Sequence, residues 1–325
     1  MAWATVVVGE SVHSATAQGA GQYALAPGRH LLQQPLALSS DMHLVGSPDG
    51  STAISGGLEV GPWRQYHPSR PIWSAPLPHF GSPRQLWVDG ARAVPARFPD
   101  GGFLRWQAAL PEPFARWGLR YESSQGIEGF GSTLVGAHVV VFWSWTASRH
   151  RVIAHLPANR TLIFDRPSRQ PLGHHLEQSG RRFVLEAFAG ALDAPGEFAV
   201  SDDGTTLLYH ANQSDLDLNR VDSFVATAGL RTLLVVEGSH PSRPLRHVTI
   251  ENVTIEHVDW DLPKTEGDEG GMADWQARAC LVDASPLTSY LLPLTFYLLP
   301  STSRLLPVAS DLPVISYLPP LAFYL

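Results

Sequence analysis

The chain has 325 residues, of which 44% are hydrophobic and only 16% are charged, and it carries 28 glycines and 27 prolines. This length allows one large or two ordinary domains, and the many turn residues beside apolar ones favour an all-β chain over a helical one. The net charge of −7 argues against a nucleic-acid partner, because such binding needs a basic surface. The single cysteine, Cys280, excludes an internal disulfide.

The N-terminus predicts a strand and not a targeting segment. Residues 1–8 lack the basic start and the long apolar core of a secretory signal, and Val6 to Val8 are typical of a first strand. The localisation therefore stays open at this point.

Short apolar runs separated by turns follow in residues 23–57. Each run is too short for a helix and is bounded by Pro-Gly, Ser-Ser, Asp-Gly or Gly-Gly pairs. Such spacing is typical of a β-sandwich or of the coils of a β-helix. We assign residues 1–98 to a first domain.

Hairpins are the main signal in the middle of the chain. Asp89-Gly90 is a strong two-residue turn, and turns at Pro157–Arg160 and Asp202–Gly204 indicate two further hairpins. Residues 99–131 are rich in Gly, Pro and aromatic residues, and we expect a long connection there. Consecutive hairpins predict an antiparallel sheet, so residues 99–225 are assigned to an inserted β-sandwich with a connecting segment.

A near-repeat marks the next segment. Val-Thr-Ile-Glu-Asn begins at Val248 and Val-Thr-Ile-Glu-His at Val253, which predicts two short strands meeting at a bend near Asn252. One coil of a solenoid cannot bury its apolar face alone and needs others stacked on it. Residues 226–284 are therefore assigned to resumed β-helix coils.

Residues 285–325 form a low-complexity tail with a period of seven residues that slips once to six. A proline in every unit argues against a coiled coil, a transmembrane helix and a central strand. The tail is interpreted as disordered or as translated non-coding repeats, with a genuine membrane-associated tail as the alternative.

Five segments carry a family resemblance through their order in the chain. They are GRHLLQQPLALSSDMHLVGSPDGSTAISGG from Gly28, RQLWVDGARAVPARF from Arg84, WSWTASRHRVIAHLPANRTLIF from Trp143, EAFAGALDAPGEFAVSDDGTTLLYH from Glu186 and RHVTIENVTIEHVDW from Arg246. The set resembles right-handed parallel β-helix proteins of the pectate-lyase-like superfamily, in the glycoside hydrolase branch that includes α-L-fucosidases and xylanases.

The resemblance implies an all-β fold, a right-handed parallel β-helix with an inserted antiparallel β-sandwich. It also implies an extracellular protein, although Met1 begins no signal peptide. Family members continue for many more coils and are expected to carry their catalytic carboxylates there, so whether this chain is an active enzyme stays open.

The densest acidic region follows the near-repeat and supplies the candidate catalytic pair. Glycoside hydrolysis needs two carboxyl groups, and Asp259 and Asp261 would share one face of a strand. His257, Trp260 and Asp274 are candidate substrate-binding residues, since an indole can stack on a sugar ring and a carboxylate can bind its hydroxyls. The alternative is a solvated loop with Trp260 packed as a lid.

Arg149 and His150 are further candidate substrate-binding residues, because they follow a strongly apolar strand and could reach a bound sugar. The alternative is structural, with Trp143 and Trp145 in the core and Arg149 at the strand end. No cofactor and no metal are expected, since His174-His175 lacks a third ligand at a useful spacing.

These observations predict a carbohydrate-active protein derived from a glycoside hydrolase acting on plant or algal polysaccharide, inactive if the later coils are missing. A non-catalytic glycan-binding or adhesive β-helix and a non-functional fragment of a faulty gene model stay open as alternatives. The expected partner is a polysaccharide or oligosaccharide, with no nucleic acid and no membrane for residues 1–284. The sequence does not fix the sugar, its linkage, the stereochemical course or the oligomeric state.

Overall fold

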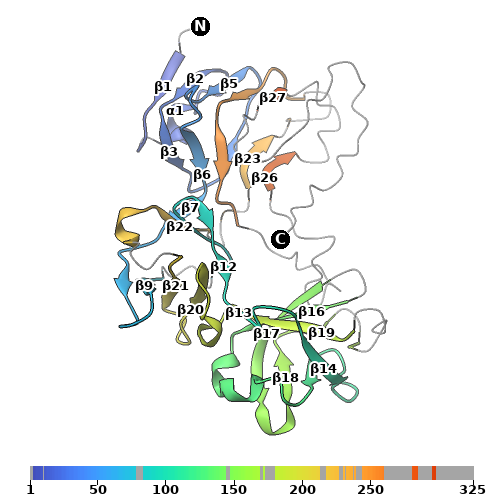
Figure 1. The fold of residues 1–325 in the computed structure, drawn as a ribbon. Helices are drawn as coiled ribbons and strands as arrows, with labels where there is room; N and C mark the ends of the chain where they lie inside the picture. Colours follow the sequence, from blue (N-terminus) through green and yellow to red (C-terminus); the bar gives the residue numbers. More distant parts are fainter. Residues whose placement is uncertain are drawn as a thin grey trace. The chain divides into compact units, whose positions relative to one another are not determined.

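The structure is a computed structural model made mostly of β-strands and turns (Figure 1). The all-β class is confirmed, since α1 (Val12–Ala15) is the one α-helix in the part of the chain that the structure describes. No helix in that part is both long and apolar enough to cross a membrane. The described residues are 3–9, 11–77, 83–143, 147–168, 171–172, 180–212, 217–226, 230, 232–236, 238, 244–259, 280–284 and 295–297.

The chain divides into two compact units, each built from segments that are distant in sequence. The first unit comprises Met1–Ser55, Thr232–Glu256 and Leu281–Leu325, and the second comprises Gly56–Arg231 and His257–Cys280. This division does not test the domain boundaries expected from the sequence, which stay predictions.

Three small sheets characterise the first unit. Their strand orders are β1-β2-β5-β24-β27, β25-β6-β3 and β26-β23-β4, and the neighbours in the first two sheets run parallel. The strands are β1 (Trp3–Val6), β2 (Gly21–Leu25), β3 (Gly28–Leu31), β4 (Leu36–Ala37), β5 (Met42–Val45), β6 (Thr52–Ser55), β23 (Thr232–Val236), β24 (Thr249–Glu251), β25 (Thr254–Glu256), β26 (Cys280–Ala284) and β27 (Thr295–Tyr297).

A sharp bend separates β24 from β25, as the near-repeat predicts. Asn252 lies between the two strands with a left-handed φ of 55°. Gly46 follows β5, and a Cβ atom there would overlap the main-chain oxygen of Asn252 and lie 2.8 Å from Cβ of Thr52. The backbones approach so closely at this point that only glycine fits without a shift.

A closed antiparallel barrel of six strands is the main feature of the second unit (Figure 1). The ring runs β19-β14-β15-β18-β17-β16, and β16 pairs back with β19, while β13 adds to β19 beside β14. Closure leaves no unpaired edge in the ring. The strands are β13 (Arg97–Phe98), β14 (Leu104–Ala109), β15 (Gly118–Tyr121), β16 (His138–Phe142), β17 (Ala147–Leu156), β18 (Thr161–Phe164) and β19 (Arg182–Glu186).

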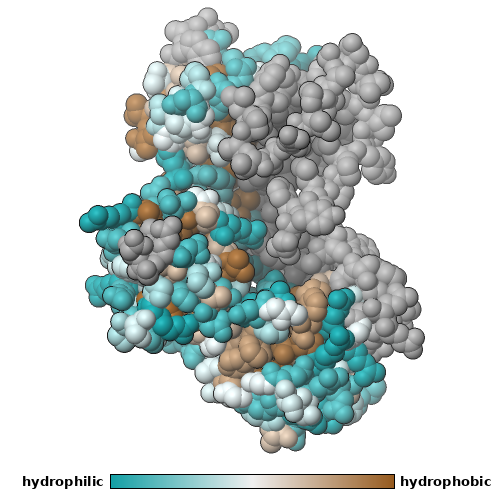
Figure 2. All heavy atoms as spheres, in the orientation of Figure 1, coloured by the Kyte–Doolittle hydropathy of each residue, from teal (hydrophilic) through white to brown (hydrophobic). Residues whose placement is uncertain are grey.

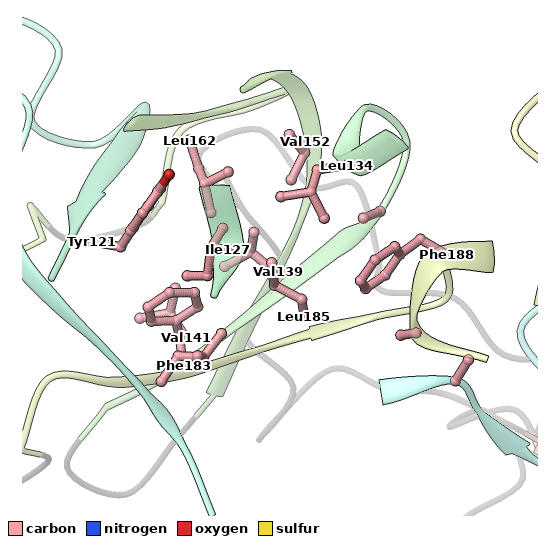
Figure 3. Packing of buried hydrophobic residues seen from close by; sticks show 14 of the residues in the cluster. Tyr121, Ile127, Leu134, Val139, Val141, Val152, Leu162, Phe183, Leu185 and Phe188 are labelled. Atoms are coloured by element: carbon pink, nitrogen blue, oxygen red, sulfur yellow. The ribbon is translucent and has the colours of Figure 1, made fainter. Parts of the chain in front are cut away.

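Alternate side chains of these strands fill the barrel. Val139 and Val141 of β16 and Phe183 and Leu185 of β19 are all 0% exposed, and Figure 3 shows them packed in one cluster. Because successive strand residues point to opposite faces, their neighbours in sequence lie on the outside of the barrel. Burying such a side chain stabilises the fold by about 1.5 to 3 kcal/mol.

Two further sheets complete the second unit, with the orders β12-β20-β21-β9-β8 and β11-β10-β22-β7. Residues of these strands and of the segments next to them form a second hydrophobic core. It includes Trp63, Leu86, Phe198 and Tyr209. The strands are β7 (Gly57–Glu59), β8 (Arg64–Gln65), β9 (Ile72–Pro76), β10 (Leu86–Val88), β11 (Ala91–Arg92), β12 (Val94–Pro95), β20 (Glu197–Val200), β21 (Thr206–His210) and β22 (Ser223–Ala226). The 3-10 helices are η1 (Ile127–Leu134), η2 (Pro157–Asn159), η3 (Ala189–Ala191) and η4 (Leu218–Arg220).

The expected right-handed parallel β-helix is wrong as the fold of this chain. The described residues form small mixed sheets, and the largest sheet is an antiparallel barrel. The inserted β-sandwich is wrong for the same reason, because the hairpin at Pro157–Arg160 belongs to a closed ring, whereas the hairpin at Asp202–Gly204 belongs to a separate sheet. Residues 99–131, expected to be a connection, hold β14, β15 and η1. In the expected low-complexity tail only Thr295–Tyr297 is described, as strand β27 beside β24.

Candidate functional site

His257 lies in an aromatic setting within the second unit. Its ring stacks on Phe224 of β22, with 5.0 Å between centroids and 19° between planes, and tilts over Trp87 of β10 at 4.6 Å. Trp87 pairs directly with Phe224 across the two antiparallel strands, which brings both side chains to one face. A Cβ on Gly57 would lie 3.0 Å from Cβ of His257, so the strand beside the ring has little room for a side chain.

The peptide group that joins Val258 to Asp259 is hydrogen-bonded through both its N–H and its C=O. Its amide donates to the carbonyl of Leu230 at 3.1 Å, and the side-chain amide of Gln85 donates to the carbonyl of Val258 at 3.1 Å. The Asp259 residue is 6% exposed. The backbone at the start of Asp259 is therefore held by residues from other parts of the chain, Gln85 and Leu230.

The remaining members of this predicted cluster, Trp260, Asp261 and Asp274, lie outside the described residues. The structure adds Gln85, which the sequence did not single out, to the surroundings of Asp259. The aromatic neighbours Trp87 and Phe224 were also missed. Leu86, Trp87 and Val88 are all apolar in sequence, so only the burial pattern of the folded strand puts Trp87 on the face opposite the core.

Arg149 and His150 lie on opposite faces of β17. Arg149 is on the outside, where its Nη1 is 2.6 Å from Oε2 of Glu186. His150 is 1% exposed on the inside, stacks on Phe164 at 4.5 Å, and places Nε2 2.9 Å from Oγ of Ser148. Burial lowers the pKa of His150 to about 4. The barrel therefore separates these two candidates, and their roles in binding a sugar stay predictions.

Three carboxylates that the sequence did not single out meet near β20. Oxygens of Asp100, Asp193 and Glu197 all lie within 4.8 Å of one another. Burial raises the pKa of Asp193, and the neighbouring Asp100 carboxylate raises it further. Oxygen ligands suit Ca²⁺.

Glu197 nevertheless serves the backbone. It accepts from the amides of Arg97, Asp193 and Ala194 at 3.1, 3.2 and 3.1 Å, which occupies both of its oxygens. Burial raises the pKa of Glu197, and these amide bonds act in the opposite direction. These hydrogen bonds hold the loop before β20 in place.

Comparisons with known proteins place the chain by its fold. No family model matches it, and no curated protein matches it. A solved structure named glycoside hydrolase has a TM-score of 0.60 and 22% identity to this chain. The match covers 73% of this chain and 43% of that one, so the chain spans less than half the length of that protein. The likeness shows that the two chains share a fold over the matched region.

Proposed function

We propose that the chain is a carbohydrate-active protein related to glycoside hydrolases and acting on plant or algal polysaccharide. The observation that carries the proposal is the fold shared with the glycoside hydrolase structure. Because that match covers 43% of the other chain, the activity and the substrate belong to the proposal and not to the comparison.

In this proposal Asp259 and Asp261 are the carboxyl pair. Glycoside hydrolysis uses one carboxyl group as a general acid and a second as nucleophile or base. The two hydrogen bonds to the peptide group between Val258 and Asp259 support this assignment, since a catalytic group has to be held in place by its surroundings. His257, Trp260 and Asp274 are proposed to bind the sugar, together with Arg149 and His150.

The test is hydrolysis of a panel of polysaccharides and aryl glycosides by the full chain. Asp259→Asn should lower kcat about 10² to 10⁴-fold, the range for a general acid or base, with less effect on binding. Asp202→Asn, which alters an exposed carboxylate in the β20–β21 turn, is the matched control and should keep the wild-type rate.

Two outcomes contradict this proposal, the first its activity and the second its catalytic residues. If the wild-type chain binds a glycan without hydrolysing any, the protein is a non-catalytic glycan-binding module. If hydrolysis occurs but is unchanged in both Asp259→Asn and Asp261→Asn, the carboxyl pair is assigned wrongly.

A further inference from the structure

Three carboxylates lie close together in the second unit. Asp100 follows β13, Asp193 lies in the loop before β20, and Glu197 begins that strand. Their oxygens all lie within 4.8 Å of one another, and none of the three forms an ion pair within the part of the chain that the structure describes. Like charges at this separation repel one another, so a cation between them would stabilise the group.

Glu197 is the fixed member of this group. Its Oε1 accepts from the amide of Arg97, and its Oε2 accepts from the amides of Asp193 and Ala194. Because a carboxylate oxygen has two lone-pair sites, Oε1 can accept a second partner. Asp100 and Asp193 are exposed, which lets an ion from solvent reach the three oxygens. The fold therefore holds one ligand in place and leaves two open to solvent.

A buried histidine distinguishes these carboxylates from the other hydrophilic residues that cover much of the region around β9, β20 and β21 in Figure 2. His210 is 6% exposed, and its Nδ1 is buried with no hydrogen-bond partner among the described residues. Buried polar groups are nearly always hydrogen-bonded, so an unpartnered ring nitrogen indicates a missing water or ligand.

The strand register places His210 on the same side of the sheet as Glu197. Phe198 of β20 pairs with Tyr209 of β21, so the adjacent residues Glu197 and His210 point to the opposite face. Burial lowers the pKa of His210, whereas the negative charge of Asp193 raises it. The ring is therefore neutral at pH 7 and close enough to the carboxylates to feel their charge.

We propose that Asp100, Asp193 and Glu197 bind a calcium ion, and that a water ligand of this ion donates a hydrogen bond to Nδ1 of His210. Ca²⁺ takes about six to eight oxygen ligands in a flexible geometry, which suits one fixed carboxylate, two exposed ones and several waters. A metal-bound water would also satisfy the buried nitrogen, since groups outside the ligand set commonly orient the ligands of a metal.

The local charge and the position in the fold support such an ion. Arg70 lies nearby, where its Nη2 donates to the carbonyl of Leu192 at 3.0 Å, and it can offset only one of the three negative charges. The ion would join the segment that leads into β14 of the barrel to the loop before β20. The inference does not depend on the proposed carboxyl pair, because the two sites share no residue.

The test is isothermal titration calorimetry of the full chain, freed of metal with EDTA, against CaCl₂ and MgCl₂, with melting curves at constant ionic strength. Ca²⁺ should bind and raise the melting temperature, because a ligand that binds only the folded state stabilises it. Mg²⁺ should bind at least about tenfold more weakly, because it needs a near-ideal octahedron and gives up its waters reluctantly.

Asp100→Asn and Asp193→Asn should each weaken Ca²⁺ binding about tenfold, since each removes a charged ligand. Without calcium both variants should keep or raise the melting temperature, because they relieve the repulsion among the carboxylates. A loss of affinity without a loss of stability separates a metal ligand from a structural residue. Asp202→Asn, in the exposed β20–β21 turn, is the matched control and should change affinity less than about twofold.

His210→Phe keeps a ring but removes the nitrogen, and it should weaken Ca²⁺ binding about tenfold. Unchanged affinity in this variant overturns the water contact.

Three results overturn the site itself. The first is no binding heat and no shift in melting temperature at millimolar Ca²⁺. The second is binding that stays unchanged in both Asp100→Asn and Asp193→Asn, because the ion then lies elsewhere. The third is equal affinity for Ca²⁺ and Mg²⁺, which shows a general attraction of cations to a chain with a net charge of −7.

Discussion

The barrel and the parallel sheets of the first unit differ in how far apart in sequence their contacts lie. The barrel forms within Arg97–Glu186, and each of its six ring strands is paired on both sides. In the first unit β5 pairs with β24, and Asp41 meets His247 at 2.8 Å although the two are 206 positions apart. The barrel should therefore form from contacts that are close in sequence. The parallel sheets instead require distant segments to meet, which costs more chain entropy.

The largest expected effect comes from removing a buried side chain from the barrel core. Phe183 is 0% exposed, and Phe183→Ala should lower the free energy of unfolding by roughly 3 to 5 kcal/mol, since it removes a fully buried ring and leaves a cavity. Urea unfolding followed by fluorescence measures the change.

Phe114→Ala is the matched control, because Phe114 is 57% exposed, and it should cost less than about 0.5 kcal/mol. Equal losses for the two variants would mean that the barrel interior contributes no more than the surface.

The same contrast explains what the sequence could predict. Asp89-Gly90, with φ of 51° and 72°, forms the hairpin between β10 and β11, and Arg160 with φ of 53° lies at the turn between β17 and β18. Turn chemistry is local, so these hairpins were correctly predicted from sequence. Closure of the ring by β16 and β19 joins Val141 to Phe183, and no local signal encodes that pairing.

The candidate site likewise depends on long-range contacts that the sequence does not reveal. An acidic segment containing Asp259 could be read from the sequence, but its anchors Gln85 and Leu230 come from other parts of the chain. The family resemblance led to a parallel β-helix because short strands with turns between them fit a solenoid. They equally fit the small sheets and the barrel that the structure contains, and only long-range pairing distinguishes these folds.

Acid should destabilise the barrel through His150. Its folded-state pKa of about 4 lies below the unfolded value of about 6.5, so the unfolded chain binds more protons between these limits. The contribution of His150 to stability should thus be full above about pH 6.5 and fall by roughly 3 kcal/mol as the pH approaches 4. His138 of β16, whose pKa burial lowers to about 3, should add to the loss over the same range. Unfolding free energies measured from pH 7 to pH 4 give the slope of stability against pH.

His150→Gln should reduce that slope by about one proton. Phe114→Ala, which removes an exposed side chain and no ionisable group, is the control and should leave the slope unchanged. An unaltered slope in His150→Gln would show that other groups cause the acid sensitivity.

The first unit should be sensitive to an added side chain at Gly46, where the backbone lies against that of Asn252. Gly46→Ala forces a Cβ against the main chain at Asn252, and overpacking of this kind costs about 1 to 3 kcal/mol. Hydrogen exchange should accelerate at the amides of β5 and β24, while the barrel keeps its protection.

Gly101→Ala is the control, because a Cβ there meets nothing within 4 Å. Loss of protection in the barrel of Gly46→Ala would mean that the two regions unfold together, which would contradict the contrast drawn between them.

The smallest expected effect is the difference in coupling energy between two ion pairs with the same N–O distance. Arg29 Nε and Glu256 Oε1 in the first unit are 2.6 Å apart and aligned as a hydrogen bond. Arg149 Nη1 and Glu186 Oε2 on the barrel are also 2.6 Å apart, but that carboxylate oxygen accepts no aligned hydrogen bond. Both pairs are partly exposed, so each coupling energy should be at most about 1 kcal/mol, with the aligned pair larger. Double-mutant cycles with Arg→Gln and Glu→Gln measure both, and a larger coupling on the barrel would reverse the expected order.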